Sequence, residues 1–250
     1  MKNVLIGIPI KNGKMFIDNL LQQINKLSYP KQYISICFIE NDSDDNTWEH
    51  LNKQIYTKLL YNNYKNITLL KLDLGFKLKH EDRHKFEYSK NRIKNLVILR
   101  NFIVNNFLKD NEYLWWVDAD IELLPENSIE YLMTHEKDIL MPYYYTEWWD
   151  CYDCASYAYV NNIIKRLNDL KNLFPQKEII ELERCECSAF INRKVFDSGL
   201  RYIYIEENYT DLCNNVIPCK LEGVSFSENA KKYGFNIFGC LQFKIKHLQC

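Results

Sequence analysis

The sequence predicts an α/β fold in which helices flank a mostly parallel β-sheet. Short apolar segments alternate with segments in which apolar residues recur at helical spacing. The first apolar segments show little polar alternation, which is typical of parallel strands covered on both faces. Strands that alternate with helices in this way are expected to form right-handed crossover units within one sheet.

The individual elements follow from this periodicity along the chain. Residues 4–8 form an expected strand that stops at Pro9, and the apolar segment that begins at residue 114 forms a strand that ends in two carboxylates. Residues 77–90 are charged, which is typical of a solvated loop. The other expected strands are 34–39, 67–72, 138–142, 188–192, 235–238 and 243–247, and the expected helices are 17–27, 48–55, about 91–108, 125–134 and 222–233.

Length, composition and charge exclude several classes of protein. The chain has 250 residues with 47% hydrophobic content, which is enough for one sizeable core. A formal net charge of −1 gives no basis for non-specific nucleic-acid binding. No apolar run of about eighteen residues predicts a membrane span, and the N-terminus does not resemble a signal peptide, so we expect a cytoplasmic location. Abundant Lys, Asn, Ile and Tyr are typical of an AT-rich genome, such as that of a large DNA virus or protist.

The nine cysteines have irregular spacing and do not form a disulfide framework. Cys151-x-x-Cys154 and Cys185-x-Cys187 offer four thiolates, which would suffice for a zinc site. Their spacing matches no standard zinc motif, so free thiols in a reducing compartment are the favoured interpretation.

Asp118-Ala119-Asp120 is the first candidate site. Ligands of open α/β sheets bind at the carboxyl ends of strands, where this motif is expected. Two carboxylates separated by one small residue suit Mg²⁺ or Mn²⁺ carrying a diphosphate, and the methyl of Ala119 leaves room for phosphates. A solvated turn after the strand is the alternative.

Three further features carry weight only in combination with that motif. Arg100 falls within the apolar stripe of its helix, so its guanidinium needs a buried anion, either a carboxylate of the protein or a ligand phosphate. Residues 143–159 are rich in aromatic rings, which line sugar and nucleotide pockets but equally fill cores. His247 becomes a candidate ligand only if the sheet brings it beside Asp120.

Five segments in order resemble the fungal mannan-polymerase family of α-mannosyltransferases, which have the GT-A glycosyltransferase fold. They are IGIPIKN, LSYPKQYISICFIENDSDDNT, EDRHKFEYSKNRIKNLVILRN, WWVDADIELLPENSIEYLMTHEKDILMP, and EGVSFSENAKKYGFNIFG followed by KIKH. The Arg-His-x-Phe-Glu block together with Asp-x-Asp is much more specific than Asp-x-Asp alone. The resemblance implies a GT-A fold with a small C-terminal antiparallel part. It also implies a single domain over 1–250, with a nucleotide-binding half over 1–120 and an acceptor half over 121–250.

The resemblance also implies roles for individual residues. Asp118 and Asp120 match the residues that hold Mn²⁺ under the diphosphate, and His247 matches a third protein ligand, for which imidazole suits Mn²⁺. Glu222 matches an acidic residue near the acceptor, and it and Arg100 are the candidates for catalysis. The implied donor-binding residues are Pro9, Asp42, Arg83, His84, Arg100, Asn101, Asp118 and Ala119.

Together these features predict a metal-dependent glycosyltransferase that moves a hexose, mannose by analogy, from a nucleotide sugar to a glycan or other hydroxyl acceptor with retention of configuration. The expected cofactors are Mn²⁺ or Mg²⁺ with GDP-mannose. A transferase that uses UDP-glucose or UDP-galactose and a non-catalytic glycan-binding subunit are the alternatives, and homo- or hetero-oligomers are compatible with each. The chain departs from the family pattern at 148–153 and 186–188, where acceptor and sugar are chosen.

Overall fold

The computed structural model describes residues 1–59, 62–77, 85–151, 153, 155–186 and 188–248. Its N-terminal half alternates strands with helices as expected. The elements of this half are β1 (Val4–Ile10), α1 (Ile17–Lys26), the 3-10 turn η1 (Lys31–Tyr33), β2 (Ile34–Glu40), α2 (Thr47–Lys58), β3 (Asn66–Lys71), α3 (Phe86–Phe107) and β4 (Tyr113–Trp116).

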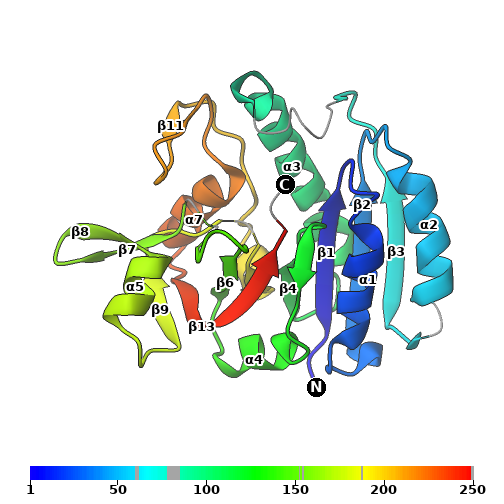
Figure 1. The fold of residues 1–250 in the computed structure, drawn as a ribbon, viewed down its shortest axis with the longest axis horizontal. Helices are drawn as coiled ribbons and strands as arrows, with labels where there is room; N and C mark the ends of the chain where they lie inside the picture. The colour runs from blue at the N-terminus through cyan, green and yellow to red at the C-terminus, as the bar shows by residue number, and fades with distance from the viewer. Residues whose placement is uncertain (60–61, 78–84, 152, 154, 187, 249–250) are drawn as a thin grey trace.

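The C-terminal half is built from shorter elements and one long strand. They are β5 (Ile121–Leu123), α4 (Ser128–Thr134), β6 (Ile139–Tyr145), β7 (Tyr157–Val160), β8 (Ile163–Arg166), α5 (Leu167–Leu173), β9 (Ile179–Leu182), β10 (Phe190–Asn192), α6 (Lys194–Asp197), β11 (Tyr209–Thr210), β12 (Val216–Ile217), α7 (Glu222–Lys232) and β13 (Ile237–His247). The β7–β8 hairpin projects from the side of the molecule opposite α2 (Figure 1).

One large sheet connects the two halves in the order β3-β2-β1-β4-β10-β6-β13-β5, with β9 also paired to β13. The strands β3, β2, β1 and β4 are parallel, whereas β10, β9 and β5 are antiparallel to their neighbours. The predicted α/β class with an antiparallel C-terminal part is therefore confirmed.

The strand order reverses direction between β1 and β4. The chain runs outward from β1 to β2 and β3, and α3 then carries it back across the sheet to β4 on the other side of β1. Right-handed crossovers place helices on opposite faces on either side of such a reversal, which leaves a crevice at the carboxyl ends of these two strands. Ligands of doubly wound folds bind at this point.

Three of the expected elements differ clearly from the structure. The helix α3 begins at Phe86, within the charged segment 77–90 that was expected to form a loop. The segments 235–238 and 243–247 form one strand, β13, rather than two, and its pairing with β6 shifts register between Gly239 and Lys244. Because a register shift breaks the alternation of side chains, the sequence gives the appearance of two shorter strands. The helix expected from Pro125 begins at Ser128.

The core is continuous across the sheet, and the ring of Trp116 packs on the backbone of β1. Trp115 and Trp116 are fully buried. A Cβ built on Gly7 would lie 2.5 Å from the ring of Trp116, so this ring occupies the space that any side chain at position 7 would need.

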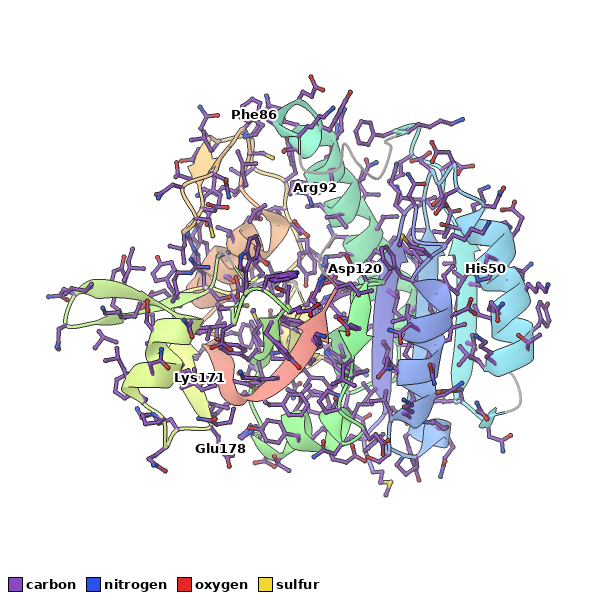
Figure 2. The ribbon with its side chains drawn as sticks, in the orientation of Figure 1. His50, Phe86, Arg92, Asp120, Lys171 and Glu178 are labelled. Carbon is purple, nitrogen blue, oxygen red and sulfur yellow. The ribbon has the colours of Figure 1, made fainter. Side chains whose placement is uncertain are left out.

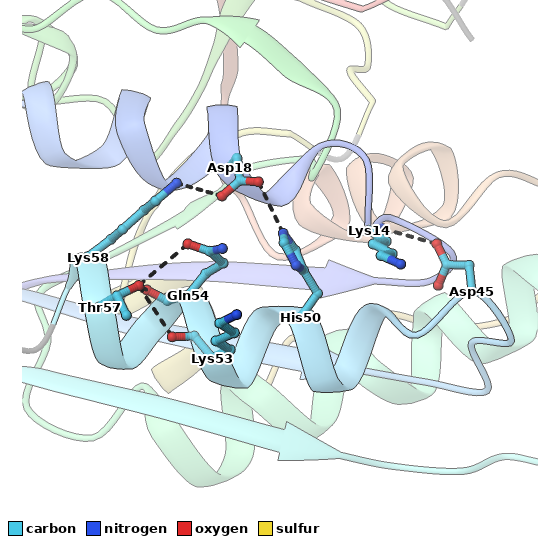
Figure 3. A network of polar contacts seen from close by, with 8 residues as sticks. All are labelled: Lys14, Asp18, Asp45, His50, Lys53, Gln54, Thr57 and Lys58. Carbon is cyan, nitrogen blue, oxygen red and sulfur yellow. Dashed lines mark hydrogen bonds and ion pairs between the residues drawn. The ribbon is translucent and has the colours of Figure 1, made fainter.

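Polar contacts on the surface join α1 to α2 (Figure 3). Asp18 of α1 lies 3.1 Å from His50 Nε2 and also pairs with Lys58, both on α2. The hydrogen bond from Lys58 lowers the pKa of Asp18. Because Asp18 is largely exposed, water screens these pairs and they orient the helices more than they stabilise them.

The cysteines depart in part from the sequence expectation. Cys37, Cys151, Cys185, Cys219 and Cys240 are free thiols, as expected. Cys213 is disulfide-bonded, so the expectation of free thiols throughout is wrong for this residue. Cys154 and Cys187 lie outside the described residues, which leaves the four-thiolate hypothesis untested.

Candidate active site

Asp118, Asp120 and His247 come together at the carboxyl ends of β4 and β13. The two aspartates follow β4, and His247 is the last residue of β13. Figure 2 labels Asp120 near the end of β13. His247 Nε2 lies 3.1 Å from Asp120 Oδ1 and 3.9 Å from Asp118 Oδ2. The backbone reinforces this arrangement, because the N–H of Leu248 donates to the carbonyl of Asp120 at 2.8 Å.

His247 has hydrogen-bond partners on both ring nitrogens. Nδ1 lies 2.7 Å from the carbonyl of Leu248, to which it donates, and Nε2 faces Asp120. Burial alone would lower the pKa of His247, but the hydrogen bond to Asp120 and the charges of both aspartates outweigh it and raise the pKa. The site thus already favours a cation between the two carboxylates.

Asp118 is the most open of the three side chains, with 37% of its surface exposed against 12% for Asp120 and 6% for His247. The hydroxyl of Ser188 donates to Asp118 Oδ2, and the carbonyl of Ser188 accepts a hydrogen bond from Tyr144 at 2.8 Å. Of the three candidate metal ligands, Asp120 and His247 are therefore buried, while Asp118 is the most open to solvent. Sequence analysis gave no signal for Ser188 as a partner of Asp118.

The donor set suits a hard or borderline divalent cation. Ligands about 2.1 Å from an octahedral ion lie roughly 3 Å apart at adjacent positions, close to the separation of His247 from Asp120. The separation from Asp118 is wider. Within the described ranges, no three His, Cys, Asp or Glu side chains are already arranged to hold a metal ion. Binding of a metal ion by all three residues would therefore require the carboxylate of Asp118, the most exposed of them, to move toward His247.

Arg100 is buried, as its place in the apolar stripe predicted, and it faces a carboxylate. Its Nε lies 3.6 Å from Glu222 Oε1, and the side chains are 3% and 8% exposed. The guanidinium carbon lies 4.6 Å from the centre of the Trp116 ring and 5.6 Å from that of Tyr202. The two catalytic candidates, one on α3 and one at the first residue of α7, thus form a single unit held between aromatic rings.

A second carboxyl that sequence analysis did not select lies close by. Burial, followed by the charges of Asp153 and Glu222, raises the pKa of Glu186 well above its ordinary value, while Arg92 acts in the opposite direction. Arg92 lies on α3, above Asp120 in Figure 2. The neutral form of Glu186 is therefore favoured, and it can donate a hydrogen bond in this part of the site.

The expected nucleoside residues lie at the ends of β1 and β2. Pro9 lies in β1 opposite Ile39 of β2. Asp42 follows β2 with a φ of 50°, and its carboxylate accepts the N–H groups of residues 74, 75 and 76 at 3.0 to 3.3 Å. Burial would raise the pKa of Asp42, but these hydrogen bonds outweigh it and lower the pKa. Asp42 thereby ties the loop after β3 to the end of β2.

For the remaining residues that were expected to bind the donor, that role stays a prediction. Asn101 uses both ends of its amide to hold the backbone of Tyr202, at 2.8 and 3.0 Å, so its direct contact with a donor stays a prediction. Ala119 lies 3.8 Å from where a Cβ on Gly13 would be, which places the loop after β1 beside the Asp-x-Asp motif. Arg83 and His84 lie outside the described residues.

Solved structures with a similar fold define its fold class, which is the GT-A fold of glycosyltransferases. The Pyrobaculum calidifontis mannosyltransferase PcManGT in complex with GDP-Man and Mn²⁺ superposes with a TM-score of 0.60 at 12% identity, covering 98% of this chain and 56% of that one. Staphylococcus aureus TarS 1–349 gives 0.60 at 13% identity, covering 98% and 60%. GalNAc-T7 with UDP, GalNAc and Mn²⁺ gives 0.59 at 13% identity, covering 100% and 44%. Identities this low establish the fold alone.

The sequence places the chain more narrowly within this class. The Anp1 family model matches residues 1–183, and the chain belongs to that family. The Mannan polymerase II complex anp1 subunit of Schizosaccharomyces pombe is 30% identical over 151 residues, which is 58% of this chain and 35% of that protein. The Mannan polymerase complex subunit MNN9 of Candida albicans is 33% identical over 147 residues, 56% and 39% respectively. The chain thus spans little more than a third of the length of these relatives.

Proposed function

We propose that the chain is a metal-dependent glycosyltransferase that moves a hexose from a nucleotide sugar to a hydroxyl of a glycan or similar acceptor, with retention of configuration. The observation that carries this proposal is the convergence of Asp118, Asp120 and His247 at the carboxyl ends of β4 and β13. Membership of the Anp1 family and the GT-A fold support it.

Each residue of the site has a role in this proposal. Asp118, Asp120 and His247 would hold Mn²⁺ or Mg²⁺, which supplies charge neutralisation for the leaving diphosphate. Arg100, which is buried and always charged, adds a fixed positive potential beside the phosphates. Glu222 is proposed to orient the acceptor hydroxyl. Because it pairs with Arg100, the acceptor side and the donor side of the site are electrostatically linked.

GDP-mannose is the proposed donor. Its support is the naming of the relatives as mannan polymerase subunits and the likeness to a mannosyltransferase bound to GDP-Man. UDP-hexoses are the second candidate, because GalNAc-T7 holds UDP in a similar fold. A non-catalytic glycan-binding subunit is the third, since the relatives are named as subunits of complexes. Those names also support assembly into a hetero-oligomer.

None of the helices in the described part of the chain combines the length and hydropathy that a membrane span requires. The cytoplasmic location expected from the sequence stays a prediction.

A donor screen tests the proposal. The purified chain is incubated with Mn²⁺ and with GDP-mannose, UDP-glucose or UDP-galactose, and both nucleotide release and sugar transfer to a mannooligosaccharide are measured. We expect activity with GDP-mannose that Asp120→Ala abolishes. Asp110→Ala, an exposed aspartate on a surface ion pair, is the matched control and should leave activity unchanged. No activity with any donor, together with nucleotide binding that Asp120→Ala does not weaken, would refute the proposal.

A further inference from the structure

A groove of about 810 Å³ lies along the outer part of the sheet, next to the candidate metal site. Its floor is one face of three adjacent strands. Lys244 and Lys246 are two residues apart on β13 and so share a face, and Lys246 lies opposite Tyr145 of β6. On the other side, Lys246 Nζ lies 2.7 Å from Glu122 of β5. Each of these residues lines the groove.

The wall of the groove is the turn that follows β6, and it presents an indole to solvent. Thr146 shapes this turn, because its hydroxyl accepts the N–H groups of Trp148 and Trp149 at 3.3 and 3.0 Å. At the end of the turn, Asp150 Oδ1 accepts a hydrogen bond from Lys244 Nζ on the floor of the groove at 2.8 Å. Trp148 is 73% exposed and lines the groove. A large flat apolar ring is thus held in water by a turn that is already ordered, which favours binding of a partner to it.

The charges of the groove favour a neutral ligand rich in hydroxyl groups. Lys246 is paired with Glu122 and Lys244 with Asp150, so neither cation is available to attract a polyanion. The paired groups still offer oxygen acceptors and N–H donors along the floor. Pyranose rings match this arrangement, because one face packs on an indole while the hydroxyls bond to charged side chains.

The groove and the candidate metal site are close neighbours on the same two strands. Glu122 is two residues beyond Asp120, roughly 7 Å along the chain. Lys246 directly precedes His247, and β5 and β13 are paired at this end. A chain bound in the groove would therefore lie within a few residues of the place where transfer is proposed to occur.

We propose that this groove binds a neutral oligosaccharide, stacked on Trp148, and that it holds the acceptor chain of the transferase; the second part rests on the proposed function. The volume accommodates several pyranose rings, as pockets of this size accommodate ligands larger than a single sugar.

Binding without donor or metal tests the groove by itself. Mannotetraose, cellotetraose and a heparin tetrasaccharide are titrated into the chain and followed by calorimetry and protein-observed NMR. We expect at least one neutral tetrasaccharide to bind and Trp148→Ala to weaken it about five- to tenfold. Trp149→Ala is the matched control, because Trp149 is a neighbouring exposed indole that does not line the groove, and it should leave affinity unchanged. Circular dichroism verifies the fold of both variants.

Three outcomes would overturn the inference: no binding of either neutral oligosaccharide, preferential binding of the heparin fragment, or equal affinities of wild type and Trp148→Ala. The transfer assay separates this result from the proposed function. If transfer occurs and Trp148→Ala leaves the acceptor KM unchanged, the acceptor groove is wrong and the transferase stands. If a neutral oligosaccharide binds through Trp148 and the donor screen refutes the transferase, the groove stands as a binding site and its acceptor role falls with the proposed function.

Discussion

Replacing Arg100 with methionine should destabilise the fold by several kcal/mol, because it leaves the buried carboxylate of Glu222 without its guanidinium. The two charged atoms are 3.6 Å apart, and the side chains are 3% and 8% exposed. With an effective dielectric constant of about 20, their attraction is about 4.6 kcal/mol. Removal of one partner from a buried pair costs about 3–5 kcal/mol. For a chain of this length that cost corresponds to a fall in Tm of roughly 6–20 °C.

The assay is urea denaturation of Arg100→Met, Glu222→Leu and the double variant, followed by circular dichroism. The double variant should be more stable than Arg100→Met, since it no longer buries an unpaired charge. Arg193→Met is the matched control, because its pair with Asp197 is exposed, and it should cost about 0.5 kcal/mol or less. A cost below about 1 kcal/mol for Arg100→Met, or a double variant less stable than either single variant, would refute the reasoning.

Three further substitutions have defined outcomes. Asp42→Asn should lower the free energy of unfolding at pH 7 and have less effect near pH 3. Burial by itself would raise the pKa of Asp42, but three backbone hydrogen bonds outweigh it and lower the pKa, so the carboxylate stabilises the fold at neutral pH and this contribution is lost as pH falls through the folded-state pKa. Urea denaturation at both pH values measures the effect, and an equal loss at both contradicts the prediction. Gly7→Ala should cost about 1–3 kcal/mol through overlap with the Trp116 ring, and an unchanged Tm would show that the contact is looser. Ser188→Ala should weaken Mn²⁺ binding about tenfold by releasing Asp118, and titration calorimetry that gives wild-type affinity would exclude this role.

The sequence predicted the burial of Arg100 but not its partner. Spacing along a helix shows which side chains share a face, so an arginine among apolar residues must be buried. Glu222 lies far along the chain, and only the packing of α7 against α3 brings it to Arg100. Both residues were therefore predicted as separate candidates, and the family resemblance favoured a phosphate over a carboxylate as the partner of Arg100, whereas the structure places Glu222 beside it.

The strands, too, divide into those that the local sequence predicts and those that depend on pairing with a distant segment. The long apolar strands β1 and β2 were predicted because burial on both faces leaves a continuous apolar pattern. The strand β5 has only three residues, Ile121 to Leu123, and it forms because the C-terminal end of β13 pairs with it. A segment this short has no periodicity of its own, so neither β5 nor the groove beside it was predictable from local sequence.

The candidate metal site was expected from the family resemblance, and its geometry rests on the sheet. Asp118 and Asp120 follow a strand whose end was predicted, whereas His247 reaches them through the order of strands in the sheet. Ser188 and Glu186 were not selected, because their roles depend on neighbours from other strands and loops.

The most direct test of the account is Mn²⁺ binding followed by electron paramagnetic resonance, in the presence of GDP, for the wild-type chain and for Asp120→Asn and His247→Ala. The account predicts that wild type binds Mn²⁺ and that each substitution lowers the affinity by at least tenfold. Wild-type affinity in both variants, or no Mn²⁺ binding by the wild-type chain, would contradict it.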